Sequence, residues 1–238
     1  MDFLKISDMC LENKNWKESI FITIDVDWAS DEVLKDTIDI LSDSNIKATI
    51  LMTHKTDLIQ DIEKNPLFEL GIHPNFNFLL NSDFRYGKNY CEVIDYYLKI
   101  VPNSKVVRSH SVTQNTSILE YFKKNGLVYD LNTEVPFSSN IMLKPYVDWT
   151  GLIKVPYFWQ ENISFAYNWN LDSSLFTNNN FLKVFNFHPI HIFLNTESIE
   201  RYNTARPYLQ TFHRLKAYKN NHDIGVRTFL NNLIGRQI

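Results

Sequence analysis

The chain has 238 residues, of which 44% are hydrophobic and 21% charged, and its formal net charge is -3. This composition is typical of a globular protein and excludes both a disordered tail and a polybasic nucleic-acid binder. Because a chain of this length can bury one large core, we expect a single domain that spans residues 1–238.

The cysteines and the N-terminal segment indicate where the protein works. Cys10 and Cys91 form no C-x-x-C pair and are too few for a disulfide-rich scaffold, so both are expected to be reduced. The N-terminal residues lack the basic start and apolar core of a signal peptide, and no apolar stretch is long enough to span a membrane. The sequence therefore predicts a cytoplasmic protein without a membrane span.

Seven short segments rich in apolar and β-branched residues predict strands. They lie at residues 19–25, 47–52, 67–72, 104–108, 127–131, 151–155 and 182–187. Between the early ones, residues 31–41 and 90–100 carry apolar side chains at helical spacing. This alternation is typical of parallel βα units.

The second half of the chain is less regular. Residues 132–180 are rich in Asn, Ser, Pro and aromatic residues, which predicts long loops with short strands. Helical spacing returns at residues 202–218 and 225–233. Long ordered loops in a compact domain are often functional, so aromatic side chains from this region are candidates for lining a groove.

Asp25 and Asp27 are the most informative pair in the sequence. Both follow the apolar run of residues 21–24, and side chains two positions apart on a strand project from the same face. Two neighbouring carboxylates repel each other unless a cation lies beside them, which favours a metal site. Taken alone, the pair could equally cap the next helix.

Further polar clusters follow other predicted strands. His73 comes after the segment 67–72, Arg108 and His110 after the fourth predicted strand, and His188 after the last. His191, three residues later, either points into the same site or packs behind it. Because the ends of parallel strands share one mouth of a barrel, we expect these side chains to converge there.

At these residues the chain resembles the polysaccharide deacetylase family, carbohydrate esterase family 4 with the NodB-type homology domain. The likeness covers roughly residues 19–233. Its motifs are Thr23-Ile24-Asp25-Val26-Asp27, Glu69-Leu70-Gly71-Ile72-His73, Arg108-Ser109-His110 and Phe185-Asn186-Phe187-His188. Together with the predicted strands, the resemblance implies an α/β fold, a distorted and incomplete (β/α) TIM-like barrel of about seven parallel strands.

The resemblance implies a metal-dependent hydrolase that removes an N-acetyl group from an amino sugar in surface-polysaccharide metabolism. It makes Asp25 the general base and Arg108 the residue that orients and ionises it. His188 becomes the general acid that protonates the leaving amine. The backbone N–H near Ser111 becomes a donor to the oxyanion.

The resemblance also implies a divalent metal, with zinc first and cobalt, nickel or iron as alternatives. Asp27 and His73 match two of the family's ligands. Asn77 stands where the family has a second histidine, and an amide oxygen is a weaker ligand for zinc than an imidazole nitrogen. Either Asn77 coordinates the metal or His110 replaces it. We favour Asn77, because it occupies the matching position.

Three residues are expected to support the substrate, an acetamido sugar or another carbohydrate. Asp130 ends a predicted strand and is expected to orient His188, while Tyr157 and Trp159 are candidates for an aromatic wall beside a sugar ring. For Trp159, packing in the core or at the rim is the alternative.

Other functions remain open from the sequence. One is a catalytically silent carbohydrate-binding protein on the same barrel, which lost its metal with the second histidine. Another is an amidohydrolase or deformylase that acts on a different amide. A phosphodiesterase would need several basic residues at the same mouth, and the sequence offers only Arg108 clearly.

Overall fold

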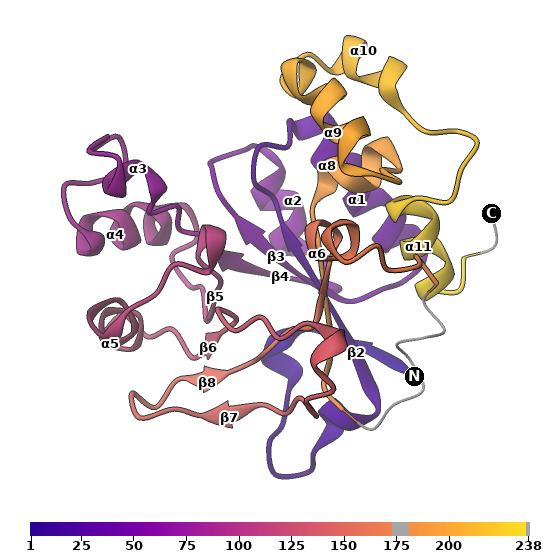
Figure 1. Ribbon diagram of the computed structural model, residues 1–238. Helices are drawn as coiled ribbons and strands as arrows, with labels where there is room; N and C mark the ends of the chain where they lie inside the picture. Colours follow the sequence, from indigo (N-terminus) through magenta and orange to yellow (C-terminus); the bar gives the residue numbers. More distant parts are fainter. Residues whose placement is uncertain (173–180, 237–238) are drawn as a thin grey trace.

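A mostly parallel sheet curls through the centre of the computed structural model, which describes residues 1–172 and 181–236 (Figure 1). Its strands are β1 (Asp2–Leu4), β2 (Ser19–Asp25), β3 (Ala48–Met52), β4 (Phe68–Ile72), β5 (Val106–Val107), β6 (Tyr129–Asp130), β7 (Tyr146–Val147), β8 (Ile153–Lys154), β9 (Trp159–Gln160) and β10 (Lys183–Phe187). Their spatial order is β7-β8-β6-β5-β4-β3-β2-β10-β9, with β1 beside β2.

The sheet is a half-barrel, as predicted. Apart from the antiparallel pair β7–β8, its described strand pairs are parallel, and β7 and β9 lie at its two ends. All seven predicted strands are present. β1, β7 and β9 are additional short strands of two or three residues, which the sequence pattern did not indicate. The distorted, incomplete TIM-like barrel is therefore confirmed.

Helices surround the sheet, and α9 and α10 stand above it at the top of the view in Figure 1. They are α1 (Asp31–Asp43), α2 (Leu58–Lys64), α3 (Asn77–Leu80), α4 (Tyr90–Ile100), α5 (Thr116–Lys124), α6 (Glu161–Ala166), α8 (Pro189–Leu194), α9 (Ile199–Ala205), α10 (Phe212–Leu215) and α11 (Val226–Leu233). Short 3₁₀ helices are η1 (Ile6–Asp8), η2 (Asn15–Lys17), η3 (His110–Val112), η4 (Phe137–Ser139), η5 (Arg206–Tyr208) and η6 (Lys216–Tyr218).

Three of the four helical predictions hold. α1, α4 and α11 match their predicted segments, whereas residues 202–218 form several short helices around Pro207. The segment 132–180 contains β7, β8, β9 and α6 among its described residues, and residues 173–180 of that prediction lie outside them.

Close packing of the central strands brings the functional strand ends together. Every residue of β2 is buried. In β4, a Cβ on Gly71 would lie 2.3 Å from a side-chain carbon of Leu51 in β3 and 2.9 Å from the carbonyl oxygen of Val106 in β5. Only glycine fits between these neighbours, and His73 follows two residues later.

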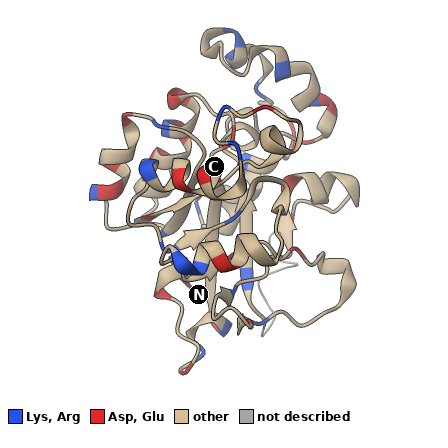
Figure 2. Ribbon diagram, turned by 90° about the vertical axis from the view of Figure 1, so that its left-hand side faces the viewer, with Lys and Arg blue, Asp and Glu red and all other residues tan. Residues whose placement is uncertain are grey.

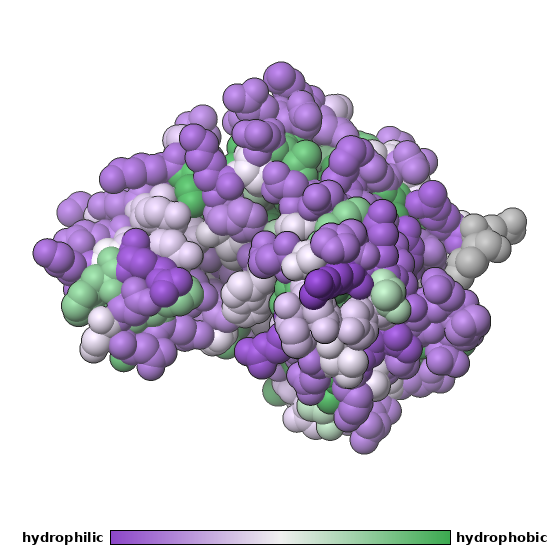
Figure 3. Space-filling view, turned by 90° about the horizontal axis from the view of Figure 1, so that it is seen from above, coloured by the Kyte–Doolittle hydropathy of each residue, from purple (hydrophilic) through white to green (hydrophobic). Residues whose placement is uncertain are grey.

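The surface is polar and mixed in charge. Basic and acidic residues are interspersed over the face drawn in Figure 2. On the face drawn in Figure 3, hydrophobic residues form small, separate patches among hydrophilic ones. Within residues 1–172 and 181–236, no helix has the length and apolar character needed to cross a membrane.

Candidate active site

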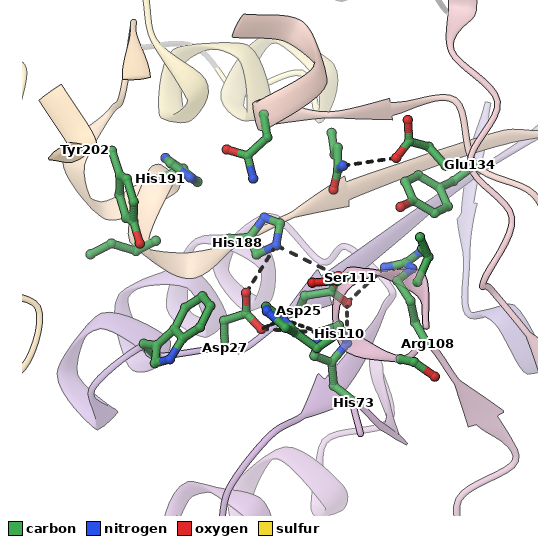
Figure 4. Close-up of a pocket in the computed structure, with 17 residues that line it drawn as sticks. Asp25, Asp27, His73, Arg108, His110, Ser111, Glu134, His188, His191 and Tyr202 are labelled. Carbon is green, nitrogen blue, oxygen red and sulfur yellow. Dashed lines mark hydrogen bonds and ion pairs between the residues drawn. The ribbon is translucent and has the colours of Figure 1, made fainter. Parts of the chain in front are cut away.

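Asp25 and Asp27 lie at the carboxyl end of β2, at the bottom of a pocket of about 400 Å³ (Figure 4). Asp25 is the last residue of the strand and is buried. Asp27 has a φ of 45°, a left-handed conformation that costs energy in a residue other than glycine and is concentrated at functional sites. The chain therefore turns at Asp27, where the backbone N–H of Ala29 donates to the carbonyl oxygen of Val26 at 3.0 Å.

Asp27, His73 and His110 form a compact cluster that could hold a metal ion. An oxygen of Asp27 lies 3.2 Å from Nε2 of His73 and 3.1 Å from Nδ1 of His110, and the two imidazole nitrogens are 3.4 Å apart. Ligands at about 2.0–2.1 Å from a tetrahedral zinc lie about 3.3 Å from one another. The three donors thus have the spacing of one face of such a site.

Three strand ends supply this cluster. His73 directly follows β4, and His110 begins η3 after β5. The backbone N–H of His110 donates to the carbonyl oxygen of Pro74 at 2.8 Å, which ties the two loops together. Hydrogen bonds from both histidines hold the pKa of Asp27 far below its ordinary value, although burial alone would raise it.

Asn77, the ligand favoured from the sequence, takes a different position. It begins α3, and its side-chain amide nitrogen lies 3.3 Å from the hydroxyl of Ser111. The geometry favours the alternative ligand, His110, because the loop after β5 brings that imidazole beside His73.

Arg108 holds Asp25 in place. Its guanidinium is 1% exposed, and Nη1 donates to Asp25 at 2.9 Å and to the side-chain oxygen of Asn186 at 2.6 Å. Asn186 in turn donates to the other oxygen of Asp25 at 2.8 Å. Burial disfavours the charged carboxylate, but the charge of Arg108, aided by His73 and His188, lowers the pKa of Asp25. Asp25 is therefore an ionised carboxylate, as expected for a group paired with arginine.

His188 faces the two aspartates from the other side of the pocket (Figure 4). Its Nε2 lies 3.6 Å from Asp27 and 4.0 Å from Asp25, and its Nδ1 is 2.8 Å from Glu161 of α6. Glu161 also accepts from the backbone N–H of His188 at 2.7 Å. Burial would lower the pKa of His188, but the charge and hydrogen bond of Glu161, with the two aspartates, raise it to about 9. The imidazole is protonated at neutral pH.

Asp130 does not orient His188, so that prediction is wrong. It is buried, accepts from the backbone and side chain of Asn132 at 2.8 and 2.7 Å, and pairs with Lys154. Asn132 accepts from the backbone N–H of Ser109 at 2.7 Å. Asp130 therefore supports the loop that follows β5 from behind the pocket.

Tyr157 and Trp159, the two aromatic residues predicted to contact the substrate, have different surroundings. Tyr157 lines the pocket, with the guanidinium of Arg108 4.5 Å from its ring centre. Trp159 is 0% exposed and stacks on Phe229 at 4.4 Å. A sugar cannot reach a ring that is enclosed by the core, so the prediction of a substrate contact for Trp159 is corrected to core packing.

Several further side chains complete the pocket. The described lining is Asp25, Asp27, Trp28, His73, Arg108, Ser109, His110, Ser111, Val112, Glu134, Tyr157, Gln160, Asn162, His188, Ile190, His191 and Tyr202. Burial lowers the pKa of His191 to about 4, so this imidazole is neutral. Burial also raises the pKa of Glu134, which lies beside Tyr157 and Gln160.

Sequence reasoning missed Glu161 and Asn186. Asn186 lies two residues before His188 on β10, so the spacing that singled out Asp25 and Asp27 could have revealed it. Glu161 lies in the segment expected to form loops, and no local pattern links it to His188.

Comparisons with known proteins identify the family of this chain. The model of a protein family described as WbmS-like polysaccharide deacetylase matches residues 22–206 of this chain. A crystal structure of WbmS from Bordetella bronchiseptica, assigned as a polysaccharide deacetylase involved in O-antigen biosynthesis, is 40% identical in sequence. Its TM-score is 0.92, over 100% of this chain and 98% of that one.

Two further comparisons give no evidence about the function of this chain. A 4-alpha-glucanotransferase from Thermococcus litoralis is 13% identical, with a TM-score of 0.45 over 90% of this chain and 38% of that one. A comparison with curated proteins finds no match. The family match covers most of the chain, and the structural match covers all of it. This chain belongs to the WbmS-like polysaccharide deacetylase family.

Proposed function

We propose that this protein is a metal-dependent hydrolase that removes an N-acetyl group from an amino sugar in surface-polysaccharide metabolism. The observation that carries the proposal is the convergence of three functions in one pocket. A cluster of metal-ligand type, an ionised carboxylate held by Arg108 and a protonated imidazole held by Glu161 all face the same space. Metal-assisted amide hydrolysis uses these three functions.

Asp27, His73 and His110 would hold the cation. One carboxylate and two imidazoles suit zinc, and also cobalt, nickel or iron, and three protein ligands leave a coordination position open. When bound, such a cation acts as a Lewis acid on the acyl oxygen and makes a water molecule acidic near neutral pH.

Asp25 is the general base of the proposed reaction. Arg108 and Asn186 hold its two oxygens and keep it ionised, so it can accept the proton of the attacking water. As the new C–O bond forms at the acyl carbon, a backbone N–H near Ser111 would donate to the developing oxyanion. Ser111 lines the pocket and has a left-handed φ of 56°.

His188 is the general acid. The C–N bond can break only when the nitrogen receives a proton, because an amide anion is a poor leaving group. Nε2 faces the pocket while Nδ1 is fixed by Glu161, so the acidic proton lies on the side of the substrate. The products are a free amine on the sugar and acetate.

The O-antigen role assigned to the Bordetella protein supports an acetamido sugar as substrate over an unrelated amide. The second imidazole, His110, supports an enzyme over a catalytically silent binding protein, because a carboxylate with two imidazoles is a strong ligand set. Tyr157 lines the pocket but is only 2% exposed and packs against Arg108, so it would support that residue and offer little ring surface to the sugar.

The test combines metal analysis with acetate release. Protein purified without chelator is expected to contain about one divalent metal ion per chain and to release acetate from N-acetylated saccharides. Removing the metal should abolish release, and adding zinc or cobalt should restore it. Bound metal without acetate release from any N-acetylated saccharide would reject the deacetylase and leave other amides. Protein that binds no metal would favour the silent carbohydrate-binding alternative.

A further inference from the structure

Residues 109–114, which we call the His110 loop, have an unusual backbone. Ser111 and Val112 are consecutive residues with left-handed φ angles of 56° and 47°. Residues other than glycine rarely adopt this conformation, and a β-branched residue such as valine is a clear outlier there. The loop would therefore adopt another backbone conformation if nothing held it, and the imidazole of His110 would move with it.

The two ends of the His110 loop are fastened to the same buried residue. At its start, the backbone N–H of Ser109 donates to the side-chain oxygen of Asn132 at 2.7 Å. At its end, the side-chain amide of Gln114 donates to the backbone oxygen of Asn132 at 2.6 Å and accepts from Nζ of Lys154 at 2.9 Å. Asn132 is thus an anchor common to both ends of the loop.

A buried ion pair fixes Asn132 in turn. One oxygen of Asp130 accepts from the backbone and side-chain N–H groups of Asn132 at 2.8 and 2.7 Å, and the other oxygen pairs with Lys154. Asp130 is 0% exposed and Lys154 is 5% exposed, and neither belongs to the described lining of the pocket. Because the side-chain nitrogen of Asn132 is bound to Asp130, its side-chain oxygen must face Ser109.

The stability of the fold does not explain why such a pair lies here. Removing two charges from water offsets most of their mutual attraction, so an apolar pair of similar volume is often as stable. A buried polar network whose members have partners does, however, make the structure around it rigid. Asp130 and Lys154 are the charged members of such a network, and the segment that it fixes is the His110 loop.

We propose that the Asp130–Lys154 pair is a clamp that holds the strained His110 loop at both ends and keeps His110 beside His73 before a metal ion binds. The inference rests on the proposed metal-dependent function and deepens it, because it assigns positioning roles to two residues outside the pocket. A ligand that is already in place needs no ordering when the metal binds, so the affinity for the metal is higher.

Metal binding tests the clamp. The double variant Asp130→Asn/Lys154→Gln, the neutral-pair variant, replaces the ion pair by two amides and leaves no buried charge without a partner. Urea unfolding first establishes that it is folded. Competition with a chelator should then show an affinity for cobalt about tenfold below that of the wild-type protein, at the lower end of the range for groups behind a metal ligand.

Two further variants accompany this measurement. Gln114 is exposed, so Gln114→Ala leaves the core intact and frees only one end of the loop. It should lower the affinity for cobalt by a smaller factor than the neutral pair does. Asp36→Asn/Arg227→Gln, which removes an ion pair between α1 and α11, is the matched control and should leave the affinity unchanged.

Two double-mutant cycles separate a clamp from a general structural role. In a protein that already carries His110→Ala, the neutral pair should cause no further loss of metal affinity, because the clamp acts through His110. Val112→Gly should raise the affinity of the neutral-pair variant, since glycine adopts a left-handed φ without strain. The same change should give no gain in the wild-type protein, whose loop is held.

Hydrogen exchange follows the clamp without a metal. In the metal-free wild-type protein, the backbone N–H of Ser109 is buried and bonded to Asn132, so it should exchange slowly with solvent. It should exchange about tenfold faster in the neutral-pair variant, because the loop then opens more often. Val112→Gly should reverse part of this increase.

Three results would overturn the inference. They are wild-type metal affinity and slow exchange in the folded neutral-pair variant, an equal loss of affinity with and without His110, and no recovery on Val112→Gly. A wild-type protein that binds no metal would reject the proposed metal-dependent function. In that protein, faster exchange that Val112→Gly reverses would still support the clamp.

Discussion

The two sides of the candidate active site are built differently. On the metal side, Asp27, His73 and His110 each lie within three residues of the strand that carries them. On the acid side, His188 also follows its strand directly, but the group that controls it, Glu161, belongs to α6 in an irregular part of the chain.

This difference shows that the positions of the reactive side chains and their proton affinities have separate structural origins. Regular βα units place reactive side chains at one mouth because parallel strands end there. The proton affinities of Asp25 and His188 come instead from Arg108 and Glu161, which approach from other elements. The predictions below test whether the two sides have separate roles, in order of decreasing effect.

The largest effect is expected for Asp25→Asn. The amide cannot accept a proton from water, so acetate release should fall by about 10³-fold, within the range for general-base catalysis. Bound metal, measured by elemental analysis, should stay near the wild-type level. Asp39→Asn, at an exposed pair with Lys35, is the control and should change neither. Full activity in Asp25→Asn would reject its role as base.

The stability of the metal-free protein should depend on the acid side. Because the pKa of folded His188 is about 9 and that of an unfolded histidine is about 6.5, protonation stabilises the fold fully below about pH 6.5. This contribution is lost as pH rises through about 9, and it amounts to at most about 3 kcal/mol. Urea unfolding at pH 6 to 10 measures it.

His188→Asn should flatten this pH dependence, because asparagine does not titrate in that range. A wild-type protein whose free energy of unfolding rises between pH 7 and 9 would contradict the assigned proton affinity of His188.

On the metal side, His110→Ala should weaken metal binding about 100-fold or more. This loss of affinity exceeds the loss usually seen when a residue that hydrogen-bonds to a metal ligand is removed. Asn77→Ala should change the affinity little, because its side chain contacts Ser111. Competition with a chelator measures both variants. The opposite result, with metal lost only in Asn77→Ala, would restore the ligand favoured from the sequence.

Glu161→Gln should have the smallest effect, a decrease of about tenfold in kcat at neutral pH. Glutamine can still accept from the backbone N–H of His188, but it lacks the charge that keeps the imidazole protonated. The basic limb of the pH–kcat profile should therefore move to lower pH. Glu200→Gln, on the surface, is the control. An unchanged basic limb would show that Glu161 does not set the proton affinity of His188.

The family resemblance implied the incomplete barrel. The sequence by itself determined the seven main strands, their parallel arrangement and the positions of Asp25, Asp27, His73, Arg108 and His188. These features follow from local patterns, since apolar runs form strands and polar residues after them share one mouth.

The tertiary structure alone decided which groups complete the site. His110 comes to His73 because its backbone bonds to Pro74, Glu161 reaches His188 from α6, and Trp159 is enclosed by the core. Each of these contacts joins segments that are distant in the sequence, so its geometry depends on how loops and helices pack and not on the pattern of any one segment.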